Sequence, residues 1–146
     1  MVYSEIEKTM GLHIQDKPNI ANAQTNKEEQ EMPLWKVYHP VGAFTAEDKK
    51  NLAKQVTEVY ASIPIPKFYV VFIFEEVAKD SCFVGGEPHN KFVRFKIDQI
   101  ARTLPGPVLR EWWIRTLDQV IAPFVKEKGY DWEISIDETP CDLWSL

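Results

Sequence analysis

Pro33 is the residue of this sequence whose type and position raise a chemical question first. Met32 and Pro33 stand directly before a strand-like run, PLWKVYH, well inside a chain of 146 residues. If the mature chain begins at Pro33, its nitrogen is a free secondary amine. An α-amino group has a reference pKa of about 7.7–8.0, and burial or nearby cations lower it, so such an amine is a base near pH 7. If residues 1–31 stay attached, the nitrogen is an amide without acid–base chemistry, and Pro33 is only the rigid first residue of a strand.

Other patterns that carry chemistry are missing or weak. The sequence has no phosphate-binding glycine motif, no G-x-S-x-G motif and no H-E-x-x-H motif. Its three histidines are scattered, and Cys82 and Cys141 have no neighbours in the sequence that would hold zinc or activate a thiol. We therefore expect no metal, no cofactor and no disulfide, and a reducing compartment, the cytoplasm.

Charge and hydropathy limit the partners. The net charge of -5 argues against the basic face that binding to a phosphate backbone requires. No apolar run approaches the length of a membrane span. We expect neither nucleic acid nor a membrane as a partner.

Residues 1–31 are predicted to form a flexible polar arm. They contain six acidic residues and three lysines, no arginine, and no apolar run of the length that a signal peptide requires. Such a segment has few groups to bury. We expect one folded domain, residues 32–146, to follow this arm.

The elements that must position Pro33 follow a β-α-β pattern. The run at 33–39 alternates like a strand, and Thr45, three residues before Asp48, is typical of a helix N-cap. Apolar residues at helical spacing then predict a helix over 46–61, which the IPIP segment ends. The run FYVVFIF, 68–74, is apolar on both faces, which is typical of a central strand covered on both sides.

The second half repeats this order. A strand is predicted over 92–97, an amphipathic helix follows and is closed by Gly129, and a last strand is predicted over 132–138. Between the halves, FVGG at 83–86 is typical of a short strand that enters a tight turn.

The fold class predicted is therefore α+β, a two-layer α/β arrangement. Tandem β-α-β units would form a four-stranded sheet with two helices on one face, and right-handed crossovers would make each strand pair parallel. The other face of the sheet would be bare, and a bare apolar face needs a partner. We expect an oligomer.

These features together resemble the tautomerase superfamily, specifically the branch that contains cis-3-chloroacrylic acid dehalogenase and its fungal homologues. The resemblance rests on the Met-Pro start, the T-x-x-D helix opening, FYVVFIFEE, FVGG and the late E-x-P at Glu138, and it covers residues 33–146. In that family the initiator methionine is removed, so that proline becomes the first residue, and the members form trimers of duplicated units. The resemblance implies a tautomerase-like fold and a homotrimer.

The resemblance also implies roles for particular residues. Arginines of the family hold the substrate carboxylate and stabilise negative charge on an enol oxygen. Arg102 falls near the second of these after a one-residue gap, and Arg94 and Lys67 are further candidates for binding the substrate. Tyr60 stands where the dehalogenase has a catalytic histidine, and Glu138 matches the family's glutamate before the proline. Each has a plainer alternative: Arg94 as a solvated or trimer-interface charge, Tyr60 as a core residue, and Glu138 as a turn residue.

Three departures argue against hydrolytic dehalogenation, of which Tyr60 in place of the catalytic histidine is the first. The family's tyrosine on the last strand is replaced by Ser135, and its water-activating glutamate near the C-terminus is replaced by Leu146.

We therefore predict a cytoplasmic, cofactor-free tautomerase-like enzyme that acts on a small 2-oxo or enol carboxylate. Pro33 would be its general base, with Arg102, Tyr60 and Glu138 as the other catalytic residues. An alternative is a decarboxylase, hydratase or dehalogenase-like activity on a three-carbon unsaturated acid. A second alternative, if the arm stays attached, is a catalytically silent oligomeric binding protein. An interaction module that recruits partners through the arm is less favoured, because the arm lacks the periodicity of a docking helix.

Overall fold

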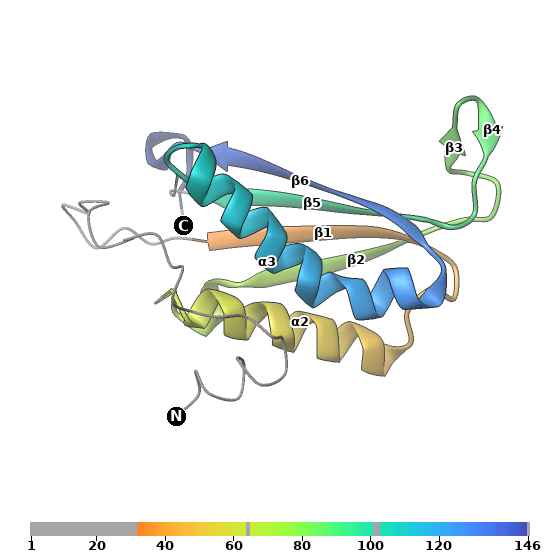
Figure 1. Cartoon of the computed structure of the whole chain (residues 1–146), viewed down its shortest axis with the longest axis horizontal. Coiled ribbons are helices and arrows are strands. Elements are labelled where there is room, and N and C mark those ends of the chain that lie inside the picture. Colours follow the sequence, from red (N-terminus) through yellow and green to blue (C-terminus); the bar gives the residue numbers. More distant parts are fainter. Residues whose placement is uncertain (1–31, 64, 101–102, 146) are drawn as a thin grey trace.

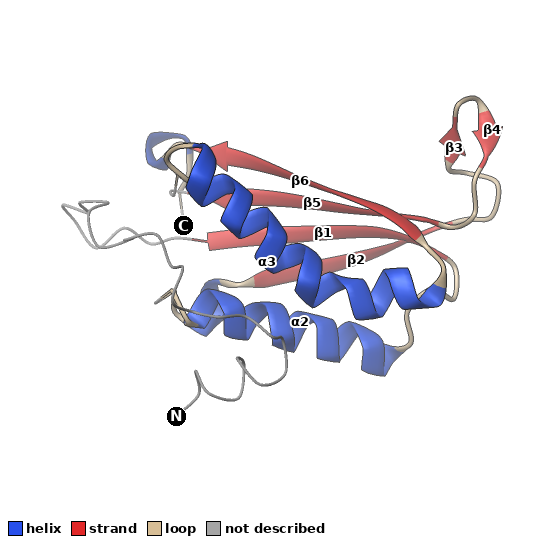
Figure 2. Cartoon of the chain, viewed as in Figure 1, coloured by secondary structure: helices blue, strands red, loops and turns tan. Residues whose placement is uncertain are grey.

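A four-stranded mixed sheet carries two long helices on one of its faces (Figures 1 and 2). The computed structural model describes residues 32–63, 65–100 and 103–145. The strand order is β2-β1-β5-β6. These strands are β1 (Met32–Pro40), β2 (Val71–Val77), β5 (Phe92–Ile100) and β6 (Asp131–Thr139). The predicted α+β class, with both helices on one face, is confirmed.

The sheet is built from two β-α-β halves. β1 is parallel to β2, β5 is parallel to β6, and β1 and β5 meet antiparallel in the middle of the sheet. α2 (Ala46–Ala61) connects the first pair, and α3 (Pro107–Val125) connects the second. The predicted duplication is therefore present in the topology.

The first helix begins and ends where its sequence predicts. Thr45 Oγ1 accepts a hydrogen bond from the Asp48 N–H at 3.0 Å, and Asp48 Oδ2 accepts one from the Thr45 N–H at 2.9 Å. This capping box satisfies donors that the first turn of α2 would leave free. α3 has no side-chain cap at Gly106 but has Pro107 in its first turn, where the missing N–H costs nothing. A short 3-10 turn, η4 (Lys126–Lys128), then leads to Gly129, whose φ of 76° fits glycine.

The second strand differs from its prediction in place and in setting. Lys67–Tyr69 form a 3-10 turn, η3, and β2 begins only at Val71. β2 is an edge strand, and Ile73 on its outer face is 41% exposed, so the prediction of a central strand covered on both sides is wrong. Phe72 and Phe74 supply the apolar residues of the helix-facing side. The apolar residues of the other side lie on a face that neither helix covers.

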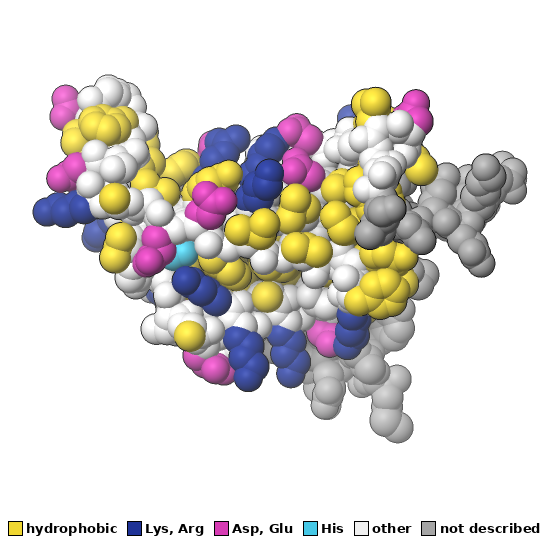
Figure 3. Space-filling model, turned by 180° about the vertical axis from the view of Figure 1, so that it is seen from behind, with side chains coloured by type: hydrophobic (Ala, Val, Ile, Leu, Met, Phe, Trp, Pro, Cys, Tyr) yellow, Lys and Arg dark blue, Asp and Glu magenta, His cyan; other side chains and the backbone are white. Residues whose placement is uncertain are grey.

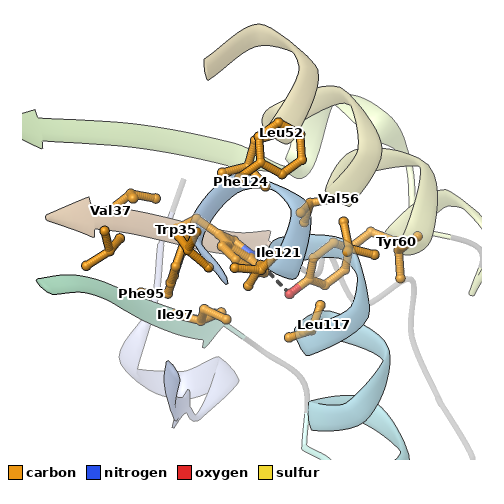
Figure 4. Packing of buried hydrophobic residues seen from close by; sticks show 14 of the residues in the cluster. Trp35, Val37, Leu52, Val56, Tyr60, Phe95, Ile97, Leu117, Ile121 and Phe124 are labelled. Carbon is orange, nitrogen blue, oxygen red and sulfur yellow. Dashed lines mark hydrogen bonds between the residues drawn. The ribbon is translucent and has the colours of Figure 1, made fainter. Parts of the chain in front are cut away.

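The core lies between the sheet and the two helices. Trp35 from β1 stacks on Phe72 with a centroid distance of 5.0 Å and meets Phe95 from β5 edge to face. The helices contribute aliphatic side chains to the same cluster (Figure 4). Its fully buried members include Trp35, Val37, Leu52, Val56, Phe95, Ile97, Trp113, Leu117 and Ile121.

A small hairpin projects from the body at one end of the sheet (Figure 1). It consists of β3 (Phe83–Val84) and β4 (Glu87–Pro88), and Gly85 and Gly86 turn between them with φ of 61° and 87°. The predicted FVGG strand and turn are confirmed. At the chain's end, η5 (Cys141–Leu143) follows β6.

The bare face of the sheet mixes apolar and charged side chains (Figure 3). Cross-strand ion pairs lie on it, such as Lys36 with Asp98 at 3.8 Å and Lys96 with Asp137.

None of the described helices is long and apolar enough to cross a membrane.

Candidate functional site

Pro33 lies at the beginning of β1 and is buried. It alternates in step with Trp35 and Val37, so its ring is on the helix-facing side of the sheet. In the ladder with β5, Met32 is opposite Ile100 and Pro33 is opposite Gln99. The setting is a packed interior rather than a solvated strand end.

Three polar or reactive positions form a row across the sheet at this level. Gln99 is opposite Pro33 on one side and opposite Glu138 of β6 on the other. Residues directly opposite each other on neighbouring strands share one face of the sheet. Pro33, Gln99 and Glu138 therefore all face the helix layer.

Tyr60 reaches this row from the last turn of α2. Its hydroxyl donates to Gln99 Oε1 at 2.9 Å. The same hydroxyl accepts from Trp35 Nε1 at 3.2 Å (Figure 4). Trp35 and Tyr60 are fully buried, and Gln99 is 2% exposed. The Tyr60 ring also meets Trp113 edge to face at 5.0 Å. Tyr60 is thus a core residue, which was the plainer alternative for it. Its hydroxyl also contacts the row formed by Pro33, Gln99 and Glu138, through Gln99.

Glu138 is held in place by its neighbours. Its Oε2 accepts a hydrogen bond from the Leu104 N–H at 3.0 Å, and Arg110 Nη2 lies 3.6 Å from its Oε1. Arg110 also donates from Nε to the Leu104 carbonyl at 2.8 Å. Arg110 had not been identified from the sequence. The sequence feature that could have identified it is its place in the first turn of the helix after β5. Because β5 ends beside the start of β1, a helix that begins soon after β5 has its first turn at the Pro33 end of the sheet.

The two further candidates for substrate binding lie at different ends of the sheet. Lys67 precedes β2, and because β2 is parallel to β1, Lys67 is at the Pro33 end; its Nζ is 2.5 Å from Glu58 Oε1. Arg94 is opposite Tyr38, five residues along β1 from Pro33, or about 17 Å at the usual rise of a strand. Its guanidinium lies on the bare face, where it pairs with Glu133. Within one chain, Arg94 and Pro33 are not brought together.

Arg102 lies outside the described residues. The cations that the described part of the chain places at the Pro33 end are Lys67 and Arg110.

A pocket of about 210 Å³ lies at the Arg94 end, at the base of the hairpin. Tyr38, His89, Phe92 and Arg94 are among its lining residues. His89 is paired with Asp131 at 2.9 Å, and Arg94 is paired with Glu133. The His89 and Arg94 side chains of this pocket thus already have acidic partners. Among the described residues, no group of three or more His, Cys, Asp or Glu side chains could hold a metal ion.

A duplicated β-α-β sheet with a buried proline near the start of its first strand is the arrangement that the resemblance to the tautomerase superfamily implied. The model of the putative oxalocrotonate tautomerase enzyme family matches residues 32–146, and the chain belongs to this family. The match begins at Met32, the residue before Pro33. No curated protein matches the chain.

Two solved structures are similar in sequence as well as in fold. Native RhCC from Rhodococcus jostii RHA1 is 42% identical, with a TM-score of 0.75 over 77% of this chain and 81% of that chain. A probable enzyme from the thermophilic fungus Aspergillus fumigatus is 37% identical, with a TM-score of 0.74 over 80% of this chain and 82% of that chain.

Two more distant structures share the fold alone. A member of the cis-3-chloroacrylic acid dehalogenase family is 16% identical, with a TM-score of 0.65 over 77% of this chain and 79% of that chain. A fused 4-OT, described as a symmetric trimer, is 24% identical, with a TM-score of 0.63 over 77% of this chain and 90% of that chain. The family match confirms the resemblance to the tautomerase superfamily, and these structures agree with it in fold.

Proposed function

We propose that this chain is a cofactor-free tautomerase-like enzyme in which Pro33, freed as the N-terminus by removal of the residues before it, is the general base. Its substrate would be a small 2-oxo or enol carboxylate, such as a phenylenolpyruvate-like compound. The observation that carries the proposal is the position of Pro33. It is the second residue of β1 and is buried, and the family match begins one residue before it.

The proposed reaction moves one proton out and one proton in. The neutral amine of Pro33 takes the hydroxyl proton of the enol, the C2=C3 double bond becomes the C2=O double bond, and C3 receives a proton from the protonated amine. A buried amine favours its neutral form because burial disfavours charge. The burial of Pro33 supports the role of base only if its nitrogen is an amine and not an amide.

The cations would bind the substrate carboxylate. Arg102 is assigned this role by resemblance, and Lys67 lies at the Pro33 end of the sheet. Arg94 would contribute to a Pro33 site only from a neighbouring copy of the chain, because both its distance along the sheet and its face separate it from Pro33 of its own chain. Because the protonated amine returns the proton in this step, Glu138, the partner acid expected from the sequence, would hold Arg110 at the Pro33 end rather than supply a proton.

The assembly proposed is a homotrimer. Its support is the bare face of the sheet, with Leu34, Val71 and Ile73 on the outer side of β1 and β2, together with the trimer described for the fused 4-OT. A reducing cytoplasm is the proposed location, consistent with Cys82 and Cys141 as free thiols.

The test compares three proteins: a chain that begins at Pro33, the same chain with Pro33→Ala, and the whole chain from Met1. The family model matches residues 32–146, and residues of this range form a continuous core, which supports folding of the shorter chain. Loss of the enol absorbance of phenylenolpyruvate is followed after subtraction of the uncatalysed rate. We expect activity for the Pro33 chain alone, and a loss of at least about 10²-fold in Pro33→Ala, as for removal of a general base. Equal activity of Pro33→Ala would overturn the proposal, provided that circular dichroism shows an intact fold.

The alternatives have their own readouts. A Pro33 chain that is inactive on enols but active on a three-carbon unsaturated acid would favour a decarboxylase, hydratase or dehalogenase-like enzyme. The mass of the protein from its native source would decide about the arm. A chain that keeps residues 1–31 there would favour the catalytically silent oligomer.

A further inference from the structure

The hydrogen bonds from Trp35 through Tyr60 to Gln99 have a fixed direction. An indole N–H donates and has no lone pair with which to accept. The Tyr60 oxygen must therefore accept from Trp35 Nε1 at 3.2 Å, which leaves the phenol proton for the next contact, at 2.9 Å. The Gln99 atom at the end of this contact must be an acceptor.

This direction fixes the orientation of the Gln99 amide. Oxygen and nitrogen of a glutamine amide have nearly the same shape, so hydrogen-bond partners must decide which is which. Since Tyr60 requires an acceptor, the amide oxygen faces Tyr60, and the NH₂ group faces away from it. Gln99 thus has two N–H donors to offer on the side that Tyr60 does not occupy.

Those donors are next to Pro33. Directly opposed residues of an antiparallel pair have Cβ atoms about 4.5–5.5 Å apart, within the length of a glutamine side chain. Gln99 is opposite Pro33 and shares its helix-facing side. A substrate whose reacting carbons meet the Pro33 nitrogen would therefore have Gln99 as an immediate neighbour.

We propose that Gln99 contacts the substrate of the Pro33 site and binds the C2 oxygen of a 2-oxo or enol carboxylate through its NH₂ group, with Tyr60 and Trp35 as positioning residues. This inference rests on the proposed function. The C2 oxygen gains negative charge when the enol proton leaves, and a fixed donor aimed at developing charge lowers the barrier without reorganisation. A neutral donor suits an oxygen that ends as a neutral carbonyl, and the cations remain for the carboxylate. The buried hydrogen bonds from Trp35 to Tyr60 and from Tyr60 to Gln99 would hold the amide in one orientation throughout the reaction.

A binding experiment tests this without turnover. The chain that begins at Pro33 is labelled with ¹⁵N, and phenylpyruvate is added while the side-chain NH₂ signals are followed by NMR. The Gln99 pair is identified by its absence in Gln99→Glu. We expect this pair to shift as the ligand saturates. A Gln99 pair that stays in place throughout the titration overturns the proposal, whether or not the protein catalyses anything.

Kinetics of two variants separate a substrate contact from a structural role. Gln99→Glu still offers Tyr60 an acceptor but has no N–H donors, whereas Gln99→Met has neither. If Gln99 binds the C2 oxygen, kcat falls about 10²–10³-fold in both variants, as for the loss of an oxyanion donor. If Gln99 only supports Tyr60, Gln99→Glu keeps the kcat of the parent chain and the proposal fails.

A matched control lies at the other end of the sheet. His39 is also a buried polar residue of the helix-facing side, so His39→Gln tests whether any change in this layer alters kcat; we expect none. If Pro33→Ala is as active as the parent chain, Pro33 is not the base, but this result does not count against Gln99. The two proposals therefore fail separately.

Discussion

Gln99 and His39 hold matching places in the two halves of the sheet. Each is the second-last residue of a 9-residue strand, and each is a buried polar side chain on the helix-facing side. Gln99 accepts a hydrogen bond from Tyr60. His39 instead packs edge to face on Phe44, its Nδ1 donates to the carbonyl of the next residue, and its Nε2 has no hydrogen-bond partner among the described residues.

The strands that begin at the two ends differ in the same way. The second residue of β1 is Pro33, beside Gln99, and the second residue of β5 is Val93, at the His39 end. Both are buried, and only Pro33 would have a reactive amine, if the proposed removal of the residues before it takes place. Buried polar groups cost free energy unless they are hydrogen-bonded. Buried side chains are joined by hydrogen bonds at the Pro33 end, whereas the His39 ring lies among aromatic rings and bonds only to the backbone among the described contacts; this difference fits the proposed placement of the chemistry at the Pro33 end.

Replacing Tyr60 by Phe is expected to have the largest effect on stability. The change leaves the Trp35 indole N–H and the Gln99 oxygen without their shared partner inside the core. An unsatisfied buried group costs about 1–3 kcal/mol, so we expect the free energy of unfolding to fall by about 2–4 kcal/mol. Urea denaturation at one fixed protein concentration measures it, because the stability of an oligomer depends on concentration. A loss below about 0.5 kcal/mol would show that the polar chain does not hold the Pro33 end together.

The same substitution at the two matching positions should have opposite results. Gln99→Leu deprives the Tyr60 hydroxyl of its acceptor and should cost about 1–3 kcal/mol. His39→Leu removes an unpartnered nitrogen, and the Pro40 carbonyl keeps its hydrogen bond from the Ala43 N–H at 3.1 Å. We expect His39→Leu to be neutral or to stabilise by up to about 1 kcal/mol. Calorimetric melting temperatures of both variants test this, and equal losses would remove the distinction between the two ends.

The sequence predicted the parts of the fold that periodicity and capping determine. The helix over 46–61 follows from Thr45, Asp48 and the apolar spacing, and the structure gives the same limits. The edge position of β2 could not be predicted in this way. The apolar type of a residue such as Ile73 favours burial, but it does not indicate which residues, if any, cover its side chain.

The alternation of residues along β5 also indicates on which face of the sheet Arg94 and Gln99 lie. Arg94 is out of step with Val93 and Phe95, which already places it on the bare face. Gln99 is in step with them, and this is the signal that could have identified it as buried. Its partner could not be predicted, because the contact with Tyr60 joins positions 39 residues apart in the chain.

The smallest expected effect concerns an ion pair on the surface at the His39 end. Asp48, in the capping box of α2, accepts a hydrogen bond from Lys128 Nζ at 2.7 Å and thereby ties the first half to the second. The hydrogen bond from Lys128, helped by the Thr45 N–H, lowers the pKa of Asp48 below its ordinary value of 3.8. A carboxylate with a lowered pKa in the folded state stabilises the fold above its ordinary pKa, and this contribution disappears as the pH falls through the lowered value.

Lys128→Met should therefore cost stability at neutral pH and little in strong acid. Because both side chains are partly exposed, we expect a cost of about 0.2–1 kcal/mol near pH 7. The difference from the parent chain should shrink as the pH falls below 3.8 and Asp48 is protonated. Lys126→Met, in the same turn but with no ion pair to Asp48 among the described contacts, is the matched control. Tyr60→Phe should show no such convergence with pH, because the hydrogen bonds that it removes join neutral side chains, those of Trp35 and Gln99. If the cost of Lys128→Met is the same at both pH values, the ion pair with Asp48 is not the source of that cost.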